Sequence, residues 1–353
     1  MKINDIRTPA LIIDKKTFEE NKEKMKELLE ETPIKLRPHY KSHKCSAIAH
    51  AQINDGAIGI TCAKLDEAAD LVDSGIEDVL IANQIVGKEK VSRLASLARC
   101  AKITVCVDNK ENVTDIENAA MLMDAKIYCL IEYEIGMQRC GVSKKEDVLS
   151  LVKHINSCKH LVFEGIQAYA GHLSHLACEE ERRAKTEENA RRIRELISYL
   201  NENAITVNTV SGGSTGTSVF KKNDTLYTEL QAGSYLFMDA TYNKLDVPFK
   251  PSLFLLTTVV SVNEKLAVVD GGVKSCGVDQ GMPVPVGFEV SKVVDSEEHL
   301  QLHNPTKKLS VGDKVLLIPA HCCSTVNLHD KLYLVEDGRV SDRLTVSARG
   351  CFH

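Results

Sequence analysis

Residues 57–99 read AIGITCAKLDEAADLVDSGIEDVLIANQIVGKEKVSRLASLAR and show the pattern on which the fold depends. Two short apolar runs, 57–63 and 78–83, alternate with longer amphipathic segments at 64–73 and 87–99. Short apolar runs between turn residues are typical of buried strands, and apolar residues at helical spacing are typical of helices that pack on a sheet. Because parallel strands need a crossover that is usually a helix, the alternation predicts parallel βα units.

The same alternation extends in both directions over the first two thirds of the chain, with further helix-like segments at 15–31 and 179–203. The strand candidates are 10–14, 35–41, 57–63, 78–83, 102–108, 126–134, 161–169 and 204–211. A series of about eight βα units predicts an α/β fold whose parallel sheet closes into a (β/α)8 barrel. An open doubly wound sheet is the alternative, but the glycine fingerprint that usually follows its first strand is missing.

Helical periodicity largely stops after about residue 245. Strand-like runs such as 254–262 and 314–319 follow, separated by Gly, Asn, Pro and Asp turns. A chain of 353 residues is long enough to bury two cores. We therefore expect two domains, a barrel over residues 1–247 and an all-β domain over residues 248–353.

Composition excludes several classes of partner. The net charge of −5 offers no general electrostatic attraction for nucleic acid or for an anionic membrane surface. No apolar run approaches the roughly 20 residues that span a bilayer, and the opening residues lack the apolar core of a signal peptide. The twelve cysteines are scattered without a CxxC pair, as expected in a reducing compartment. The sequence thus predicts a cytoplasmic protein that binds neither nucleic acid nor membrane.

Residues 36–44, LRPHYKSHK, carry an unusual row of cations. In an extended strand Lys35, Arg37, His39 and Lys41 would share one side. Burying such a row requires a compensating anion or a lysine that gives up its proton, and a neutral, positioned lysine is a nucleophile for carbonyl groups. The alternative is an exposed, solvated basic strand.

A glycine-rich stretch, Ser211 to Thr217 (SGGSTGT), follows the last strand candidate of the barrel. Phosphate groups often bind in the loops after the last two strands of a barrel, where glycines let backbone N–H groups approach an anion. An ordinary flexible turn is the alternative. The stretch also matches the G-x-S-x-G elbow of serine hydrolases, but the helix that this elbow requires after the serine is not indicated by SVFKKNDT.

Two further clusters end strand candidates. Arg139 lies in EYEIGMQRCG (132–141), where its planar donors would suit an oxygen anion. Tyr169 lies in QAYAGH (167–172), where its ring would stack on a flat cofactor. A surface arginine and a core tyrosine are the alternatives.

The β domain contains a triplet of metal-binding residue types, His321-Cys322-Cys323. In an extended segment His321 and Cys323 would point the same way and reach one metal together. Nitrogen and sulfur ligands favour Zn²⁺ over Mn²⁺ or Mg²⁺. Two protein ligands leave positions for water or substrate, so such a zinc would behave as a Lewis acid.

Taken together, these motifs resemble the metal-activated, pyridoxal-phosphate-dependent branch of the alanine-racemase-like barrel enzymes (fold type III). That branch includes D-threonine aldolase, 3-hydroxy-D-aspartate aldolase, D-threo-3-hydroxyaspartate dehydratase and D-serine dehydratase. The matching segments are Thr8-Pro9-Ala10, RPHYKSHK (37–44), IANQIVG (81–87), QRCGV (138–142), IQAY (166–169), ELQAGSYLFMD (229–239) and HCCSTVNLHD (321–330).

The resemblance implies a barrel followed by a β domain, paired as a homodimer, that acts on small D-amino acids. It implies that Lys41 carries pyridoxal phosphate covalently, with Lys44 the weaker candidate, and that Arg139 binds the phenolic oxygen of the cofactor ring. The remaining implied cofactor contacts are Gln84, Tyr169, Ser211, Gly212, Gly213, Thr215 and Tyr235. His321 and Cys323 are the implied metal ligands.

The resemblance also bears on the reaction. Aldolases of the family carry His-x-Asp at the metal site and dehydratases carry His-x-Cys, so His321-Cys322-Cys323 favours a dehydratase that converts D-serine or a related D-β-hydroxy amino acid into a keto acid and ammonia. The alternative is an aldolase that yields glycine and an aldehyde, which the segments 81–87 and 229–239 resemble at least as closely. A regulatory pyridoxal-phosphate-binding protein and a metal-free racemase are lesser alternatives.

Overall fold

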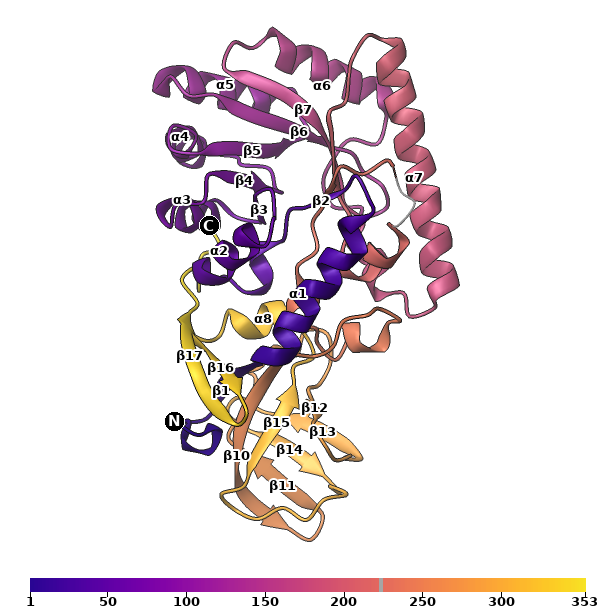
Figure 1. Cartoon of the computed structure of the whole chain (residues 1–353). Helices are drawn as coiled ribbons and strands as arrows, with labels where there is room; N and C mark the ends of the chain where they lie inside the picture. Colours follow the sequence, from indigo (N-terminus) through magenta and orange to yellow (C-terminus); the bar gives the residue numbers. More distant parts are fainter. Residues whose placement is uncertain (222–224) are drawn as a thin grey trace. The chain divides into compact units, whose positions relative to one another are not determined.

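The computed structural model describes residues 1–221 and 225–353, apart from the side chain of His175. It divides into two compact units (Figure 1). The first, which we call the β unit, comprises Met1–Lys26, Ser42–Ala47 and Ser234–Gly350. The second, which we call the barrel unit, comprises Glu27–Lys41, Ile48–Gly233 and Cys351–His353. Because the chain passes between the units several times, each is built from segments distant in sequence.

The barrel unit contains an eight-stranded, all-parallel sheet with the order β2-β9-β8-β7-β6-β5-β4-β3. Its strands are β2 (Lys35–Leu36), β3 (Ile60–Cys62), β4 (Asp78–Ile81), β5 (Lys102–Val107), β6 (Ile127–Glu132), β7 (Leu161–Ala168), β8 (Thr209–Gly212) and β9 (Glu229–Leu230). The two edges also meet, because a parallel bridge joins His39 to Thr61 and the N–H of Ile58 donates to the carbonyl of Leu36. The predicted (β/α)8 barrel is confirmed.

Helices connect the barrel strands as the periodicity predicts. They are α3 (Leu65–Asp73), α4 (Lys88–Leu97), α5 (Lys110–Met123), α6 (Lys145–Ser157) and α7 (Glu179–Glu202), while α1 (Lys15–Glu30) and α2 (Ser46–Asn54) run from one unit into the other. In α3 the apolar face of Leu65, Ala68 and Leu71 is buried. At its start Glu67 accepts the N–H groups of Ala63 and Lys64, which satisfies donors that a helix N-terminus leaves unpaired.

The β unit is a mostly antiparallel nine-stranded sheet. It consists of β1 (Ala10–Asp14), β10 (Leu253–Asn263), β11 (Leu266–Val269), β12 (Val284–Pro285), β13 (Lys292–Asp295), β14 (Leu300–His303), β15 (Lys314–Ile318), β16 (Lys331–Glu336) and β17 (Arg339–Thr345). A short helix, α8 (Cys322–Val326), follows β15. The β-rich region expected after residue 245 is therefore present, and the domain boundary at residues 247–248 stays a prediction.

Two strand predictions were wrong in detail. Residues 10–14 form a strand, but it pairs with β10 and β16 in the β unit instead of opening the barrel. A strand that is buried on both faces shows no alternation of apolar and polar residues, so its sequence does not indicate which sheet it joins. Its place among the eight barrel strands is taken by β9, which has two residues and no detectable period. Residues 35–41 are a strand only at Lys35–Leu36, and Tyr40–Ser42 form a 3-10 turn. Within the described residues, no helix is long and apolar enough to span a membrane.

Candidate active site

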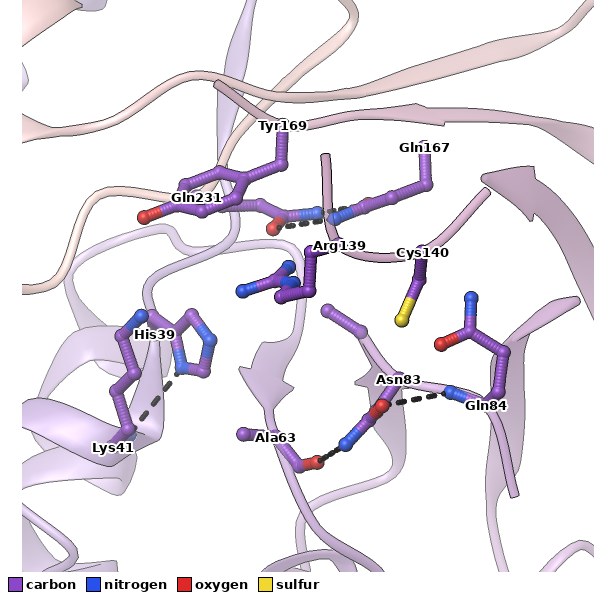
Figure 2. Close-up of a pocket in the computed structure, with 11 residues that line it drawn as sticks. His39, Lys41, Ala63, Asn83, Gln84, Arg139, Cys140, Gln167, Tyr169 and Gln231 are labelled. Carbon is purple, nitrogen blue, oxygen red and sulfur yellow. Dashed lines mark hydrogen bonds between the residues drawn. The ribbon is translucent and has the colours of Figure 1, made fainter. Parts of the chain in front are cut away.

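A cavity of about 150 Å³ lies at the carboxyl ends of the barrel strands (Figure 2). It is lined by His39, Lys41, Ala63, Ala82, Asn83, Gln84, Arg139, Cys140, Gln167, Tyr169 and Gln231. Most of these residues end or follow β3, β4, β6, β7 and β9. The carboxyl-terminal face of a parallel barrel is where active sites form, since loops from every strand converge there. Four predicted residues, Lys41, Gln84, Arg139 and Tyr169, thus share one cavity.

The segment that leads to Lys41 is fixed by its neighbours. The Arg37 side chain is 5% exposed and pairs with Asp78 at 2.6 Å and Glu229 at 2.8 Å. Beyond it, the N–H of His39 donates to the carbonyl of Ala232, and the N–H of Lys41 donates to Nδ1 of His39 at 3.3 Å. The sequence analysis expected an anion to compensate the row of cations. Two carboxylates, Asp78 and Glu229, are present, and both pair with Arg37.

The predicted row is only partly correct. Lys35 is exposed, whereas Arg37, His39 and Lys41 are buried or half-buried. Lys41 reaches the cavity from a 3-10 turn, because the extended backbone ends before Tyr40. On the other side of the segment Tyr40 is buried and its hydroxyl donates to Asp70.

Tyr169 lies near both cations of the cavity. The Nζ atom of Lys41 lies 5.5 Å from the centre of its ring, and the guanidinium carbon of Arg139 lies 5.8 Å from it. Figure 2 shows the three side chains directed into the same space. An aromatic face beside two cations stabilises their charge and offers a flat surface to a planar ligand.

A carboxylate that the sequence analysis missed contacts two residues of the cavity. Glu132, at the end of β6, is 3.7 Å from Arg139 and accepts a hydrogen bond of 2.5 Å from Gln84. Burial raises the pKa of Glu132, and the hydrogen bond from Gln84 and the charge of Arg139 oppose that rise. Gln84 and Arg139 are therefore oriented by one buried acid. Its position in the strand-end cluster EYEIGM was the available signal.

A pair of amides, also missed, forms part of the cavity lining. Gln231 donates to Gln167 at 2.6 Å, and Gln167 donates back at 3.2 Å. Gln231 also donates to Ser211, whose hydroxyl donates in turn to Glu229. Ser211 is thus a buried link between the cavity and the ion pair of Arg37, and its predicted contact with a cofactor stays a prediction.

The glycine-rich loop has the features of an anion cradle. Gly212 pairs in register with Ala168, next to Tyr169, and an added Cβ there would lie 2.1 Å from the Ala168 carbonyl oxygen. Gly213 adopts a φ of +73°, which favours glycine. The hydroxyl of Thr215 is buried, and within the described part of the chain it has no hydrogen-bond partner. A buried polar atom without a partner is costly, and a phosphate oxygen would satisfy it.

These residues fit a phosphorylated pyridine ring. The barrel unit supplies an amine, a guanidinium, an aromatic face and a loop with an unsatisfied hydroxyl. Tyr235 belongs to the β unit, where it is buried against Phe249 with ring centres 5.8 Å apart. Its predicted cofactor contact stays a prediction.

The β unit places His321 and Cys323 together, although the predicted reason was wrong. The segment is not extended: His321 precedes the first turn of α8 and Cys323 lies within it. Burial alone would lower the pKa of His321, but interaction with the Cys323 thiol and then with Asp279 raises it to about 9. Cys322 is buried and its sulfur lies 3.6 Å from the Ser234 hydroxyl. Within the described residues no group of three or more His, Cys, Asp or Glu side chains is arranged to hold a metal, so a two-ligand site stays a prediction.

Comparison with known proteins identifies the family of this chain. The family model for the alanine racemase N-terminal domain matches residues 13–241, and a model for a domain of serine dehydratase type matches residues 252–335. D-threonine aldolase from Arthrobacter sp. is 38% identical, with 98% of this chain and 93% of that protein covered. 3-Hydroxy-D-aspartate aldolase from Paracoccus denitrificans is 36% identical, with the same shares covered.

Structures and more distant relatives extend the comparison. The crystal structure of D-threonine aldolase from Filomicrobium marinum matches with a TM-score of 0.95 and 37% identity over 99% of this chain and 98% of that one. D-threo-3-hydroxyaspartate dehydratase from Delftia sp. is 26% identical, with 78% of this chain and 73% of that protein covered. The chain belongs to the family of alanine-racemase-like barrel enzymes with a C-terminal β domain, whose named relatives here are lyases: aldolases and dehydratases.

Proposed function

We propose that this protein is a pyridoxal-phosphate- and metal-dependent aldolase that cleaves D-β-hydroxy-α-amino acids into glycine and an aldehyde. One observation carries the proposal: two aldolases match 98% of this chain at 36% and 38% identity, whereas a dehydratase matches 78% at 26%. Sequence analysis favoured a dehydratase from the His321-x-Cys323 pattern alone, and the wider similarity favours the alternative.

Lys41 is the residue we propose to carry the cofactor. Its amine enters the cavity beside Tyr169, and the backbone bond to His39 fixes the turn from which it extends. Pyridoxal phosphate, when bound, supplies an electron sink that lets a bond at the substrate Cα break. Once released by the incoming amino acid, the Lys41 amine is placed to hold or deliver a proton at Cα.

Arg139 and Tyr169 are proposed to orient the ring. Arg139, held by Glu132, would donate to the phenolic oxygen, and Tyr169 would pack on the ring face. The backbone of Gly212 and Gly213 and the hydroxyl of Thr215 would hold the phosphate. Orientation of this kind decides which Cα bond breaks, because the breaking bond must align with the electron sink.

His321 and Cys323 are proposed to hold a divalent metal, for which imidazole and thiolate together favour zinc. The mutual contact of the two side chains in the β unit fits such a site. A metal there would supply a Lewis acid for the substrate hydroxyl. We also propose a homodimer in the cytoplasm, and sedimentation of the purified protein tests the dimer.

A dehydratase remains the second candidate, because Cys323 stands where the family's aldolases carry aspartate. Product analysis separates the two. D-threonine, D-serine and 3-hydroxy-D-aspartate are incubated with the enzyme, with and without a chelator, and glycine and keto acid are measured. Glycine as the main product supports the aldolase, and a keto acid with ammonia overturns it. Lys41→Ala serves as the inactive control.

A further inference from the structure

The imidazole of His321 is held by a carboxylate that sequence analysis did not single out. Its Nδ1 atom lies 2.6 Å from Oδ2 of Asp279. The other oxygen of Asp279, Oδ1, accepts a hydrogen bond of 2.5 Å from the Ser324 hydroxyl. Both carboxylate oxygens are engaged, so the carboxylate has one orientation relative to the ring. All three residues lie in the β unit.

The backbone around this contact is also fixed. The hydroxyl of Thr325 donates to the carbonyl of His321 at 2.7 Å and accepts the N–H of Gly277 at 3.1 Å. A Cβ added to Gly277 would lie 2.0 Å from the Ser324 hydroxyl oxygen. Only glycine therefore lets the segment that carries Asp279 approach α8 so closely. The first turn of α8 and residues 277–279 form one connected structure around His321.

This arrangement sets which ring nitrogen is available. An imidazole whose Nδ1–H donates to a carboxylate presents the lone pair of Nε2 on the opposite edge. We propose that Asp279, oriented by Ser324, is a positioning residue that directs Nε2 of His321 toward a divalent metal shared with Cys323. The inference rests on the proposed function, because it takes His321 and Cys323 as the metal ligands.

A plain surface ion pair is the competing explanation. The Asp279 side chain is 50% exposed, and exposed pairs contribute little to stability. A surface pair would leave metal affinity unchanged, whereas loss of a partner that orients a ligand typically weakens metal affinity or activity by about 10- to 100-fold. Metal affinity therefore distinguishes the two explanations without recourse to enzyme activity.

The test uses the full-length, cofactor-loaded enzyme with Co²⁺ as the probe. The dissociation constant is measured by competition with a chelator, and the thiolate-to-cobalt absorption band reports coordination by Cys323. We expect Asp279→Asn to weaken Co²⁺ binding by about 10- to 100-fold, Asp279→Glu to recover part of the loss, and Ser324→Ala to weaken binding by a smaller factor. Asp330→Asn, which removes an exposed partner of Arg349, is the matched control and should bind like the wild type.

Two outcomes overturn different claims. If Asp279→Asn binds Co²⁺ like the wild type while His321→Ala does not, the positioning role is wrong and the proposed function stands. If neither His321→Ala nor Cys323→Ala changes metal binding, the metal assignment in the proposed function is wrong, and this inference fails with it. Should Asp279→Asn fail to fold, Ser324→Ala carries the test, and unchanged binding in that variant contradicts the positioning role.

Discussion

The amine of Lys41 and the guanidinium of Arg139 lie on the same aromatic ring, that of Tyr169, at 5.5 Å and 5.8 Å from its centre. The three residues follow β2, β6 and β7. These strands are parallel members of one sheet, so the segments after them emerge at the same face and line one cavity. The proposed chemistry therefore depends on the barrel topology.

Lys41→Ala should abolish both cofactor attachment and activity. The wild-type holoenzyme should absorb at about 420 nm, as expected of pyridoxal phosphate bound to a lysine, and the variant should lose this band and at least about a thousandfold in kcat. Lys35→Ala is the matched control, because Lys35 is an exposed lysine of the same segment. A Lys41→Ala protein that keeps the band would show that another amine carries the cofactor.

Two substitutions of Tyr169 distinguish the contribution of its ring to cofactor affinity from the contribution of its hydroxyl. Tyr169→Phe should keep most of the cofactor affinity, because a phenyl ring still offers a face to the cations and to the pyridine. Tyr169→Ala should weaken affinity by about 2- to 12-fold, the equivalent of roughly 0.5–1.5 kcal/mol for an aromatic contact with the cofactor ring. Fluorescence titration of the apoenzyme with pyridoxal phosphate measures both. Equal affinities in the two variants would contradict a role for the ring face.

Removal of the unsatisfied Thr215 hydroxyl should have opposite effects on the stability of the apoenzyme and on its affinity for the cofactor. Thr215→Val removes a buried, unpaired oxygen and should stabilise the apoenzyme by about 1 kcal/mol, while it weakens binding of pyridoxal phosphate. Thr217→Val is the control, because the Thr217 hydroxyl accepts the N–H of Ser214 at 3.1 Å and its loss should destabilise the apoenzyme. Thermal unfolding with and without cofactor measures both effects. Tighter cofactor binding by Thr215→Val would refute the phosphate assignment.

Substitution of the two adjacent cysteines, Cys322 and Cys323, should have different effects on metal binding. Cys323→Ser should release zinc, because a hydroxyl is a poorer zinc ligand than a thiolate. Cys322→Ser should keep it, since Cys322 is buried toward Ser234, and the neighbouring Cys323 thiol together with burial raises the pKa of the Cys322 thiol well above its usual range. Metal content after dialysis measures the difference. Zinc loss from Cys322→Ser alone would reverse the assignment of the two sulfurs.

Acid stability should depend on Glu117. Burial alone would raise its pKa, but hydrogen bonds from the His160 ring and from the N–H groups of Lys159 and His160 lower it. A lowered pKa in the folded state contributes stability above the unfolded value of about 4.3, and this stability is lost as the pH falls through the folded value. Glu117→Gln should therefore flatten the loss of stability on the acid side.

Urea unfolding midpoints between about pH 5 and pH 3 test this dependence. Glu111→Gln is the control, because Glu111 is exposed on the same helix, α5. An equal acid slope in the wild type and Glu117→Gln would show that the contacts with His160 and Lys159 do not affect acid stability.

The barrel was predictable because its strands and helices have strong periods, as residues 57–99 show. The assignment of β1 to the β unit was not, because an apolar pentapeptide carries no information about which sheet it joins. β9 was missed because two residues cannot display a period. Short polar motifs singled out Lys41, Arg139 and Tyr169, and all three line the cavity, while their roles stay predictions. Glu132, Gln167 and Gln231 were missed, since they act through partners that only the folded sheet brings together.

His321 and Cys323 interact, but not for the reason that the sequence suggested, and their role as metal ligands stays a prediction. Alternation in an extended segment predicted that the two side chains share a side, but α8 begins between them. They nevertheless interact, because one precedes the helix and the other lies in its first turn. The contact of His321 with Asp279 could not be predicted from the sequence, because the two residues are 42 positions apart and no local pattern links them.

The fate of D-threonine in a single sample, followed by proton NMR with ammonia assayed in parallel, decides between aldolase and dehydratase. An aldolase releases one glycine and one acetaldehyde for each D-threonine consumed, with no ammonia, and Lys41→Ala should show no turnover. Formation of 2-oxobutanoate with an equal amount of ammonia would show that the protein is a dehydratase.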